Sequence, residues 1–346
     1  MKRYKYFIGI DVSKLTLDFA IMSLEKLIYH RKIANDDTAI ASMLIELKGV
    51  SGFKISNSVF GMEHTGVYCN KILSALQRKK ASIVYENPTH IKNSLGSLRG
   101  KNDKLDSIRI ATYLKKSKDD LRLCQGKRRI IQELASLVAL RDRLSRTKRA
   151  LKTPLKEDQL FVCTKFAIQN EKFSLRSIQA LEADIDMLDD NIKLLCSSDP
   201  KINRMMEIIT SIPCIGHFTA LQMIITSNEF ETINGPKQFA AYAGLAPYPK
   251  QSGTGLQYRN RVSNVANKKM KTLLHTCAML SNRFVPEMHA YFKRKTEIEG
   301  KPKMLVFNAI RSKLVLRVFS CIKQDRLYTK DYCTNNEDLN LGAKKT

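Results

Sequence analysis

The first third of the chain alternates short strand-like runs with amphipathic helical runs. Residues 6–10 are aromatic, β-branched or glycine, and residues 15–22 and 26–33 form two further β-rich runs only a few positions apart. Connections this short are typical of antiparallel strands, because parallel strands need a longer crossover. The pattern therefore predicts an antiparallel meander of three strands.

Helix and strand signals then follow in turn. A helix is predicted from Asp36 to the helix-ending Gly49. Residues 55–62 and 81–85 are typical of strands, and residues 67–79 of a helix between them. A meander followed by β-α units is the order of an RNase H-like mixed sheet, in which the added strands pair in parallel through helical crossovers. The predicted class is therefore α/β.

Four carboxylates occupy positions that such a fold would bring to one sheet edge. Asp11 follows the first strand and Glu63 the fourth, while Asp103 and Asp106 lie one turn apart on one face of a helix that they begin. Taken singly, an Asp after a strand is usually a turn residue, and an Asp in a first helical turn is usually a cap. Taken together, four close carboxylates cannot all ionise without cations among them. Two Mg²⁺ ions about 4 Å apart would satisfy them and form a clamp for phosphodiester displacement.

Composition indicates a polyanionic partner. Lys and Arg total 59 against 33 Asp and Glu, a net charge of +26, and nucleic acid is the usual partner of so basic a protein. Basic residues alternate beside the acidic helix, as suits contact with a nucleic-acid backbone: Arg99, Lys101 and Lys104. No run of about 18 apolar residues exists, and Asp11 stands where a signal peptide needs its apolar region. We therefore expect a soluble cytoplasmic protein with reduced, mostly buried cysteines, none of which forms a C-x-x-C pair.

Two helices without strand signals are predicted in the middle of the chain. The first spans residues 127–151 and is rich in Arg and Lys, and the second has an apolar heptad from Ile178 to Leu195 and is rich in Asp and Glu. They would pack as an antiparallel pair or across a dimer interface. Two explanations of their charges stay open: the helices neutralise each other, or the basic helix lies on nucleic acid while the pair joins two protomers.

The C-terminal third combines turn signals with the densest positive charge of the chain. Residues 211–216 precede an apolar run and predict a hairpin between helices, which often presents backbone amides to phosphates. Residues 249–255 predict a flexible loop carrying Ser252, and a serine among Pro and Gly is by itself usually a turn residue. Residues 241–330 hold 18 Lys or Arg and 4 Asp or Glu, which predicts phosphate contacts without sequence reading. The candidate nucleic-acid contacts here are Lys250, Arg259, Arg261, Lys268 and Lys269.

The acidic motif resembles the tetrad of a known family. Asp11, Glu63 and the run Lys101-x-Asp103-x-x-Asp106 are similar to the acids of the DEDD transposases of the insertion-sequence 110 family. That family has a RuvC-like N-terminal domain and includes the Piv-type DNA invertases. The resemblance extends over most of the chain.

The C-terminal motif carries the same resemblance. Residues 239–247 followed by 250–255 resemble the signature of the family's C-terminal domain, in which the serine before the glycine, here Ser252, is the nucleophile. The chain departs from the family pattern at Cys214, where the family has the first glycine of a turn, and at Ala266, where the family has a glycine before asparagine.

The resemblance implies an organisation and a mechanism. We expect a RuvC-like catalytic domain over residues 1–120, a helical coiled-coil linker over 121–199, a mainly α-helical transposase domain over 200–330 and a polar, disordered tail over 331–346. Ser252 would attack a DNA phosphate while Mg²⁺ ions on the four acids stabilise the charge, and the phosphoserine link would conserve the bond energy for rejoining. A structured guide RNA from the element itself would pair with both DNA partners. The protein would act in the bacterial cytoplasm, associated with the nucleoid, as a dimer or tetramer.

Two other functions remain open from the sequence. In a RuvC-like nuclease, a metal-bound water would hydrolyse DNA and Ser252 would be structural. In a non-catalytic nucleic-acid-binding protein, the basic surface would act without chemistry. A covalent protein–DNA adduct separates recombinase from nuclease, and metal-dependent cleavage would exclude the non-catalytic protein.

Overall fold

The structure is a computed structural model that describes residues 4–95, 102–252 and 256–330. The chain divides into two units, Met1–Gly126 and Lys127–Thr346. Four predictions lie wholly or partly outside the described residues: the roles of Arg99 and Lys101, residues 253–255 of the expected loop, and the disordered tail at 331–346. Within the described residues, no helix is long and apolar enough to cross a membrane.

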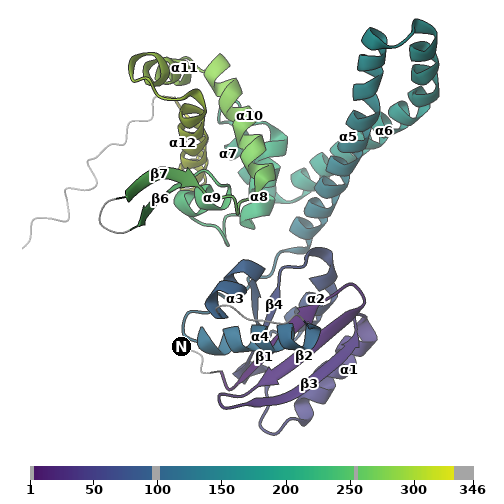
Figure 1. The fold of residues 1–346 in the computed structure, drawn as a ribbon, viewed down its shortest axis with the longest axis vertical. Coiled ribbons are helices and arrows are strands. Elements are labelled where there is room, and N and C mark those ends of the chain that lie inside the picture. Colours follow the sequence, from purple (N-terminus) through teal and green to yellow (C-terminus); the bar gives the residue numbers. More distant parts are fainter. Residues whose placement is uncertain (1–3, 96–101, 253–255, 331–346) are drawn as a thin grey trace, which may run out of the picture. The chain divides into compact units, whose positions relative to one another are not determined.

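The N-terminal unit is built on one five-stranded mixed sheet (Figure 1). Its strands are β1 (Tyr6–Val12), β2 (Thr16–Met22), β3 (Leu27–Ala34), β4 (Ser58–Glu63) and β5 (Ser82–Glu86), in the spatial order β3-β2-β1-β4-β5. The first three pair antiparallel, while β4 pairs parallel with β1 and β5 parallel with β4. The predicted meander with added parallel strands is therefore confirmed.

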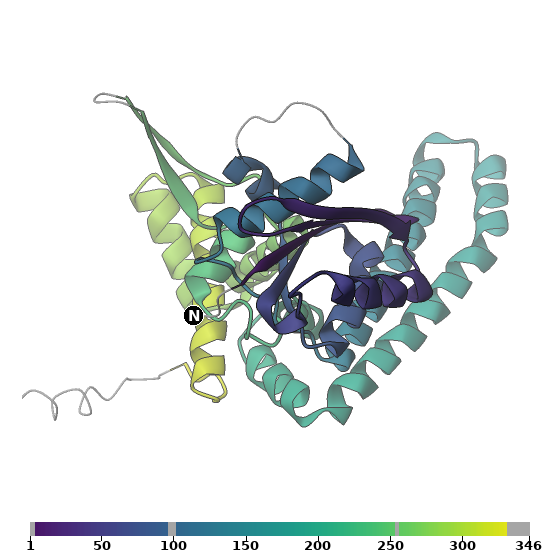
Figure 2. The ribbon, with the colours of Figure 1, turned by 90° about the horizontal axis from the view of Figure 1, so that it is seen from below.

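Helices cover both faces of this sheet (Figure 2). Helices α1 (Asp37–Glu46) and α2 (Asn70–Arg78) pack on the face that carries Ile8 and Ile10, and α4 (Asp103–Lys116) on the face that carries Phe7. A further helix, α3 (Pro88–Leu95), was not predicted; its leading proline has the fixed φ that suits a first helical turn.

One predicted strand begins later than expected. Residues Ile55–Asn57 form a 3-10 turn before β4, because the Asn57 side chain accepts a hydrogen bond from the Lys54 amide at 3.0 Å and captures the backbone locally. Such side-chain bonds to the backbone compete with strand pairing.

Two glycines allow α4 to lie close against the sheet. A Cβ on Gly9 of β1 would overlap the backbone of Ser107 and Ala111, and a Cβ on Gly61 of β4 would lie 2.8 Å from Leu114 Cδ1. Only glycine permits so close a backbone approach. The contact at Gly9 fixes the second turn of α4 over β1, and therefore also the position of the first turn, which carries Asp103 and Asp106.

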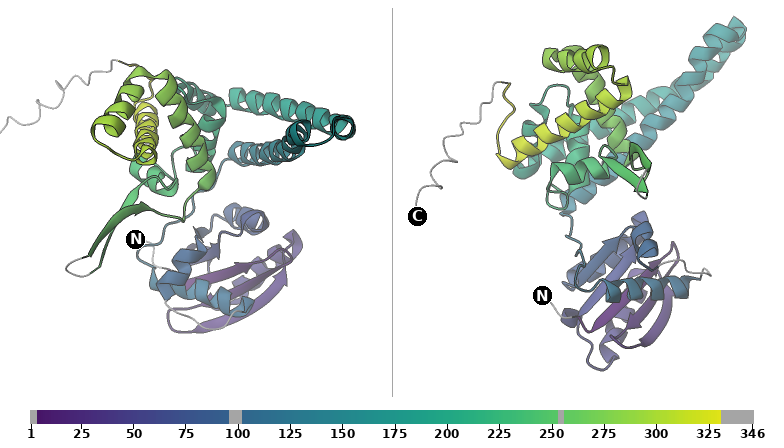
Figure 3. Two further views of the ribbon diagram at one scale, coloured as in Figure 1. Left: turned by 45° about the horizontal axis from the view of Figure 1, so that its top comes forward. Right: turned by 60° about the vertical axis from the view of Figure 1, so that its left-hand side comes forward.

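The C-terminal unit is mainly helical (Figures 1 and 3). It begins with a hairpin of two long helices, α5 (Arg129–Phe161) and α6 (Thr164–Ser198), joined at residues 162–163. The remaining elements are α7 (Pro200–Thr210), α8 (His217–Ser227), α9 (Pro236–Tyr242), β6 (Pro247–Ser252), β7 (Leu256–Val262), α10 (Lys268–Phe284), α11 (Pro286–Lys293), a π-helical turn (Arg294–Ile298) and α12 (Lys303–Lys323). Helices α7 to α12 surround an apolar core. The predicted turn between helices at 211–216 is confirmed.

The heptad of the acidic helix is buried inside this hairpin. Ile178, Ile185 and Ile192 of α6 are all buried, and α5 packs along α6. The expected antiparallel pairing of the two helices is therefore confirmed. The seam from Ile178 to Leu195 is largely covered by the chain's own α5, so this seam is used within the hairpin rather than across a dimer interface.

The expected flexible loop at 249–255 is wrong for its first four residues. Residues 249–252 belong to β6, which pairs antiparallel with β7 from Pro247 opposite Val262 to Ser252 opposite Leu256. Prolines are tolerated here because each strand of a two-stranded sheet is an edge strand. The alternating apolar and polar residues of β7 were the available strand signal.

We expect Gly9→Ala to destabilise the N-terminal unit by about 1–3 kcal/mol, because the methyl group would push α4 off the sheet. Urea unfolding of the purified chain measures the loss. Gly49→Ala is the matched control, since no atom lies within 4 Å of a Cβ at that position. Equal stability of the two variants would contradict the close contact.

Candidate functional site

Acidic side chains form a row across one end of the N-terminal sheet. Gly9 faces α4, and Asp11, two residues further along β1, lies on the same face. The strand register places Asp18 of β2 directly opposite Asp11, and Glu86 of β5 beside Glu63 of β4. Four adjacent strands therefore each contribute one carboxylate to the end of the sheet beside the first turn of α4.

The first turn of α4 adds the last two acids. The side chain of Asn102 caps this helix by accepting a hydrogen bond from the Lys104 amide at 2.9 Å, and Asp103 and Asp106 follow in the first turn. Asp106 and Asp103 both act electrostatically on Asp11. The structure thus brings the four predicted acids, Asp11, Glu63, Asp103 and Asp106, into one electrostatic cluster, here called the acidic cluster.

Crowding of like charges perturbs the acidic cluster. Burial, followed by repulsion from Asp106, Asp103, Glu63 and Asp18, raises the pKa of Asp11 to about 6. Burial and repulsion from Asp106 also raise the pKa of Glu63. Carboxyl groups with raised pKa values are poorly compensated by their surroundings, and this is the arrangement that a bound cation would relieve.

Basic side chains partly offset this charge from outside the row. Lys32 Nζ of β3 donates to Asp103 Oδ2 at 2.9 Å and lies 3.4 Å from Asp18 Oδ2. Arg109 of α4 donates to Asp106 Oδ1 at 2.6 Å. Asp18, which is only 3% exposed, also lies 3.1 Å from the Nε2 atom of His30. Lys32 therefore links the buried end of the row to α4.

Sequence reasoning missed Asp18, Lys32 and Glu86. The available signal was a carboxylate inside the apolar run of β2, followed by a lysine inside the next strand. Which face these side chains occupy depends on strand register, and register is set by pairing between distant residues.

The donor chemistry of the acidic cluster fits a divalent metal, although its side chains are not arranged around one. Carboxylate oxygens are the ligands that Mg²⁺ prefers. Among the described residues, no group of three or more His, Cys, Asp or Glu side chains has the geometry to hold an ion. Two of the acids instead direct an oxygen to a basic side chain, Asp103 to Lys32 and Asp106 to Arg109.

The predicted nucleic-acid contacts divide between the two units. Lys104 is exposed in the first turn of α4, and Arg261 and Lys268 are exposed at the end of β7 and the start of α10. Lys269 forms an ion pair with Asp142 of α5. Lys250 lies in β6 and Arg259 in β7. Ser252 is the last residue of β6, in the C-terminal unit.

Charge pairing accounts for part of the charge on the long helices. Arg141 of α5 binds Asp189 of α6, and Lys148 and Lys152 both lie near Glu182. Of the two explanations left open by the sequence, mutual neutralisation therefore holds for these residues.

The turn between α7 and α8 has a backbone that favours glycine. Cys214 adopts a left-handed conformation with φ 67°, a region in which a Cβ is strained. Cys214 therefore replaces the family glycine at a position whose backbone conformation favours glycine.

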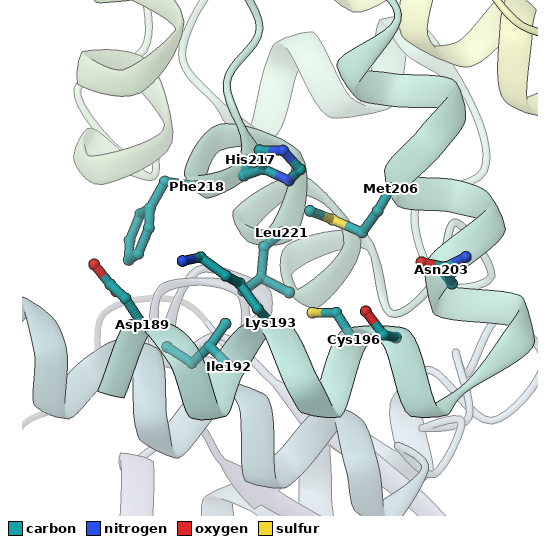
Figure 4. A pocket seen from close by; sticks show the side chains of 10 residues that line it. Asp189, Ile192, Lys193, Cys196, Asn203, Met206, His217, Phe218 and Leu221 are labelled. Carbon is teal, nitrogen blue, oxygen red and sulfur yellow. The ribbon is translucent and has the colours of Figure 1, made fainter. Parts of the chain in front are cut away.

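A cavity in the C-terminal unit is a weaker candidate for chemistry. It measures about 310 Å³ and lies between α6, α7 and α8, with Ile192, Met206 and Leu221 among its apolar lining (Figure 4). The carboxylate that lines it, Asp189, already binds Arg141. We therefore place the candidate site at the acidic cluster.

Comparison with known proteins gives two family matches and several relatives. A transposase family model for the DEDD type of IS110 matches residues 8–160, and the model of the IS116/IS110/IS902 transposase family matches residues 206–293. The pilin gene-inverting protein of Moraxella bovis is 25% identical over 331 residues, which cover 94% of this chain and 98% of that protein. The transposase for insertion sequence element IS1111A of Coxiella burnetii is 24% identical over 209 residues, covering 54% of this chain and 56% of that protein.

We expect Asp11→Asn to stabilise the metal-free chain at pH 7 by about 1 kcal/mol, after allowing for solvent screening. The pKa of Asp11 is raised to about 6 from an ordinary value of 3.8, so ionisation costs stability as the pH rises from about 4 to about 6. Asparagine mimics the protonated acid, and the gain should therefore vanish at pH 4.

Thermal unfolding in a chelator across this pH range measures the effect. Asp119→Asn, at an exposed position just beyond α4, is the control and should show no such pH dependence. A wild-type melting temperature that equals that of Asp11→Asn at pH 7 would contradict the repulsion.

Proposed function

The chain belongs to the IS110 family of transposases, and we propose that it is a DNA recombinase that cleaves and rejoins strands through Ser252. The observation that carries this proposal is the acidic cluster, in which the N-terminal unit gathers the four acids of the family tetrad at one end of its sheet, where burial and then mutual repulsion raise the pKa of Asp11 to about 6. The second support is Ser252 at the end of β6, within the segment that matches the second family model.

We propose an RNase H-like fold for the N-terminal unit. The supporting features are the antiparallel β1–β3 meander, the parallel pairing of β4 and β5, and a helix on each face of the sheet. This arrangement ends β1 and β4 at the same edge, so Asp11 and Glu63 become neighbours although 52 positions separate them.

In the proposed reaction, the four acids hold metal ions and Lys32 positions one of the acids. Asp11, Glu63, Asp103 and Asp106 would hold two Mg²⁺ ions, which when bound supply stabilisation of the charge on the phosphate and on the leaving oxygen. Lys32 holds Asp103 by one oxygen, Oδ2, and so limits the rotation of a side chain that is otherwise half-exposed. Lys32 is thus a positioning residue in this proposal, acting through Asp103.

Ser252 supplies the nucleophile. Its Oγ forms a bond to the phosphorus of one DNA strand as the bond to the strand's leaving oxygen breaks, and that oxygen takes up a proton. The phosphoserine link keeps the energy of the phosphodiester, so rejoining needs no external energy source. A serine hydroxyl is a weak nucleophile near neutral pH and needs activation. The histidine closest to Ser252 in sequence, His275, is 23 positions away, so the acids with their metal ions are the proposed activator. The reaction therefore requires both the acids of the N-terminal unit and the serine of the C-terminal unit.

The proposed substrate is DNA, and the proposed partner is an element-encoded guide RNA in the bacterial cytoplasm. Support for DNA comes from the family and from the relatives, one of which is named as inverting a pilin gene. The net charge of +26 is suited to holding two kinds of nucleic acid through their phosphates. The guide RNA is proposed from the family resemblance, because the sequence carries no recognised module that reads base edges.

We expect Ser252→Ala to bind DNA within about twofold of wild type while forming no covalent adduct and no recombinant product, because affinity comes from the basic surface rather than from the nucleophile. Asp106→Ala should likewise bind and fail to cleave. Denaturing gels of a labelled duplex with Mg²⁺ report the adduct, and gel shifts report binding.

Ser263→Ala, which removes a hydroxyl just beyond β7, is the control and should keep full activity. Recombination by Ser252→Ala would show that the nucleophile is elsewhere. Cleavage by wild type without any adduct would favour a hydrolytic nuclease instead.

We propose that a second, exposed heptad joins the protomers. Phe166, Phe173, Met187 and Leu194 of α6 are 56%, 74%, 67% and 72% exposed. With Ala180 they recur at every seventh position, and we call them the outer seam. An exposed apolar residue at every seventh position favours packing against another helix, and the same seam of a second copy provides one under two-fold symmetry.

We expect Phe173→Glu combined with Met187→Glu to reduce the mass of the free protein to that of one chain, because both charges would be buried in the seam. Light scattering measures the mass. Gln179→Glu, at an exposed polar position beside the outer seam, should leave the mass unchanged. A monomeric wild type would refute the assignment.

A further inference from the structure

Arg311 is a buried cation that pairs with no acid among the described residues. It lies on α12 and is only 4% exposed, and its Nε donates weakly to the Phe307 carbonyl of its own helix at 3.4 Å. Among the described residues, no carboxylate lies within ion-pair distance of it. Burial lowers its pKa. Burial of an unpaired charge is unfavourable, because the charge loses its hydration without gaining a partner.

Most of the elements around Arg311 contain no acidic residue. Residues 232–286 and 300–324 contain no Asp or Glu at all, and these segments include α9, the β6–β7 hairpin, α10 and α12 itself. The acid at the start of α11, Glu287, already binds Arg317. On α7, Glu207 lies near Arg204. Among the described residues, Arg311 is therefore left without an acidic partner, and a bound anion would supply one.

Two more basic residues face the same place from α10. His275 is close enough for the charge of Arg311, after burial, to lower its pKa, and its Nδ1 atom is buried without a hydrogen-bond partner. Lys271 lies one helical turn earlier, on the same face of α10. Its Cδ atom would lie 3.8 Å from a Cβ on Gly244. We call Lys271, His275 and Arg311 the basic cradle.

The basic cradle lies at the base of the hairpin that carries Ser252. Asn308, one turn before Arg311 on α12, donates from Nδ2 to the Leu245 carbonyl at 2.7 Å. Gly244 and Leu245 lead directly into β6. Lys271 and His275 are half-exposed, whereas Arg311 is buried.

We propose that the basic cradle binds one backbone phosphate of a nucleic-acid strand at the base of the β6–β7 hairpin. A phosphate accepts two parallel hydrogen bonds from a guanidinium, and the neutral tautomer of His275 with a proton on Nδ1 adds a third donor. Binding converts an uncompensated buried charge into a paired one, so this contact gains more than a phosphate contact at an exposed lysine. The inference rests on the proposed function and adds to it a phosphate position near the nucleophile.

The test compares Arg311→Met with Arg317→Met in the full chain. Both remove an arginine from α12, but Arg317 has Glu287 as its partner. Arg311→Met should raise the melting temperature of the free protein by a few degrees and lower the affinity for a mixed-sequence DNA duplex about tenfold. It should also reduce the salt slope of binding, which is the slope of log K against log salt concentration, by about one in magnitude. Arg317→Met should not raise the melting temperature, and its affinity and salt slope should stay near wild type.

The salt slope decides the outcome. An Arg311→Met protein that binds with the wild-type slope overturns the basic cradle, whatever its melting temperature. If that variant does not fold, Arg311→Lys keeps the charge and loses the forked donor, and it should bind several-fold more weakly; binding equal to wild type would overturn the inference. A wild-type protein that binds no nucleic acid would instead refute the proposed function.

Discussion

Repulsion between carboxylates at one end of the N-terminal sheet is the constraint on which the candidate site depends. Asp11, Asp18 and Glu63 occupy neighbouring strands on one face, and burial strengthens their interaction because water screens it less. Apolar contacts on both faces of the sheet hold this arrangement, with Ile8 and Ile10 on one side and Phe7 on the other. The fold thus maintains a charge distribution that the side chains alone would not adopt.

The C-terminal unit contains uncompensated buried charge of the opposite sign. Among the described residues, Arg311 and His275 have no acidic partner, and both lie on helices that contain no Asp or Glu, whereas Arg141, Lys148 and Lys152 of α5 find acids on α6. Charges within the α5–α6 hairpin are therefore partly neutralised, whereas the positive charge of Arg311 is not neutralised by acids of the described residues. In the proposed function, metal ions would neutralise the acids of the N-terminal unit, and nucleic-acid phosphates would neutralise the basic residues of the C-terminal unit.

Close backbone contact connects these charges to the fold. Gly9 lets α4 approach β1 at Ser107 and Ala111, which places the first turn of that helix beside the end of the strand. Asn308 has a comparable role in the other unit, since its bond to the Leu245 carbonyl ties α12 to the segment entering β6. In both places an uncharged residue determines where charged residues meet.

The sequence by itself determined the order of the five N-terminal strands and the positions of the four acids, because residue periodicity, turn residues and spacing are local properties of the chain. Ser252 was singled out only by the resemblance to the family. Tertiary structure decided what depends on distant pairing. Register added Asp18 and Glu86 to the acidic row, and pairing with β7 turned an expected loop into the strand β6. Packing of α10 against α12 isolated Arg311, whose lack of a partner no local pattern reveals, because desolvation depends on everything that surrounds a side chain.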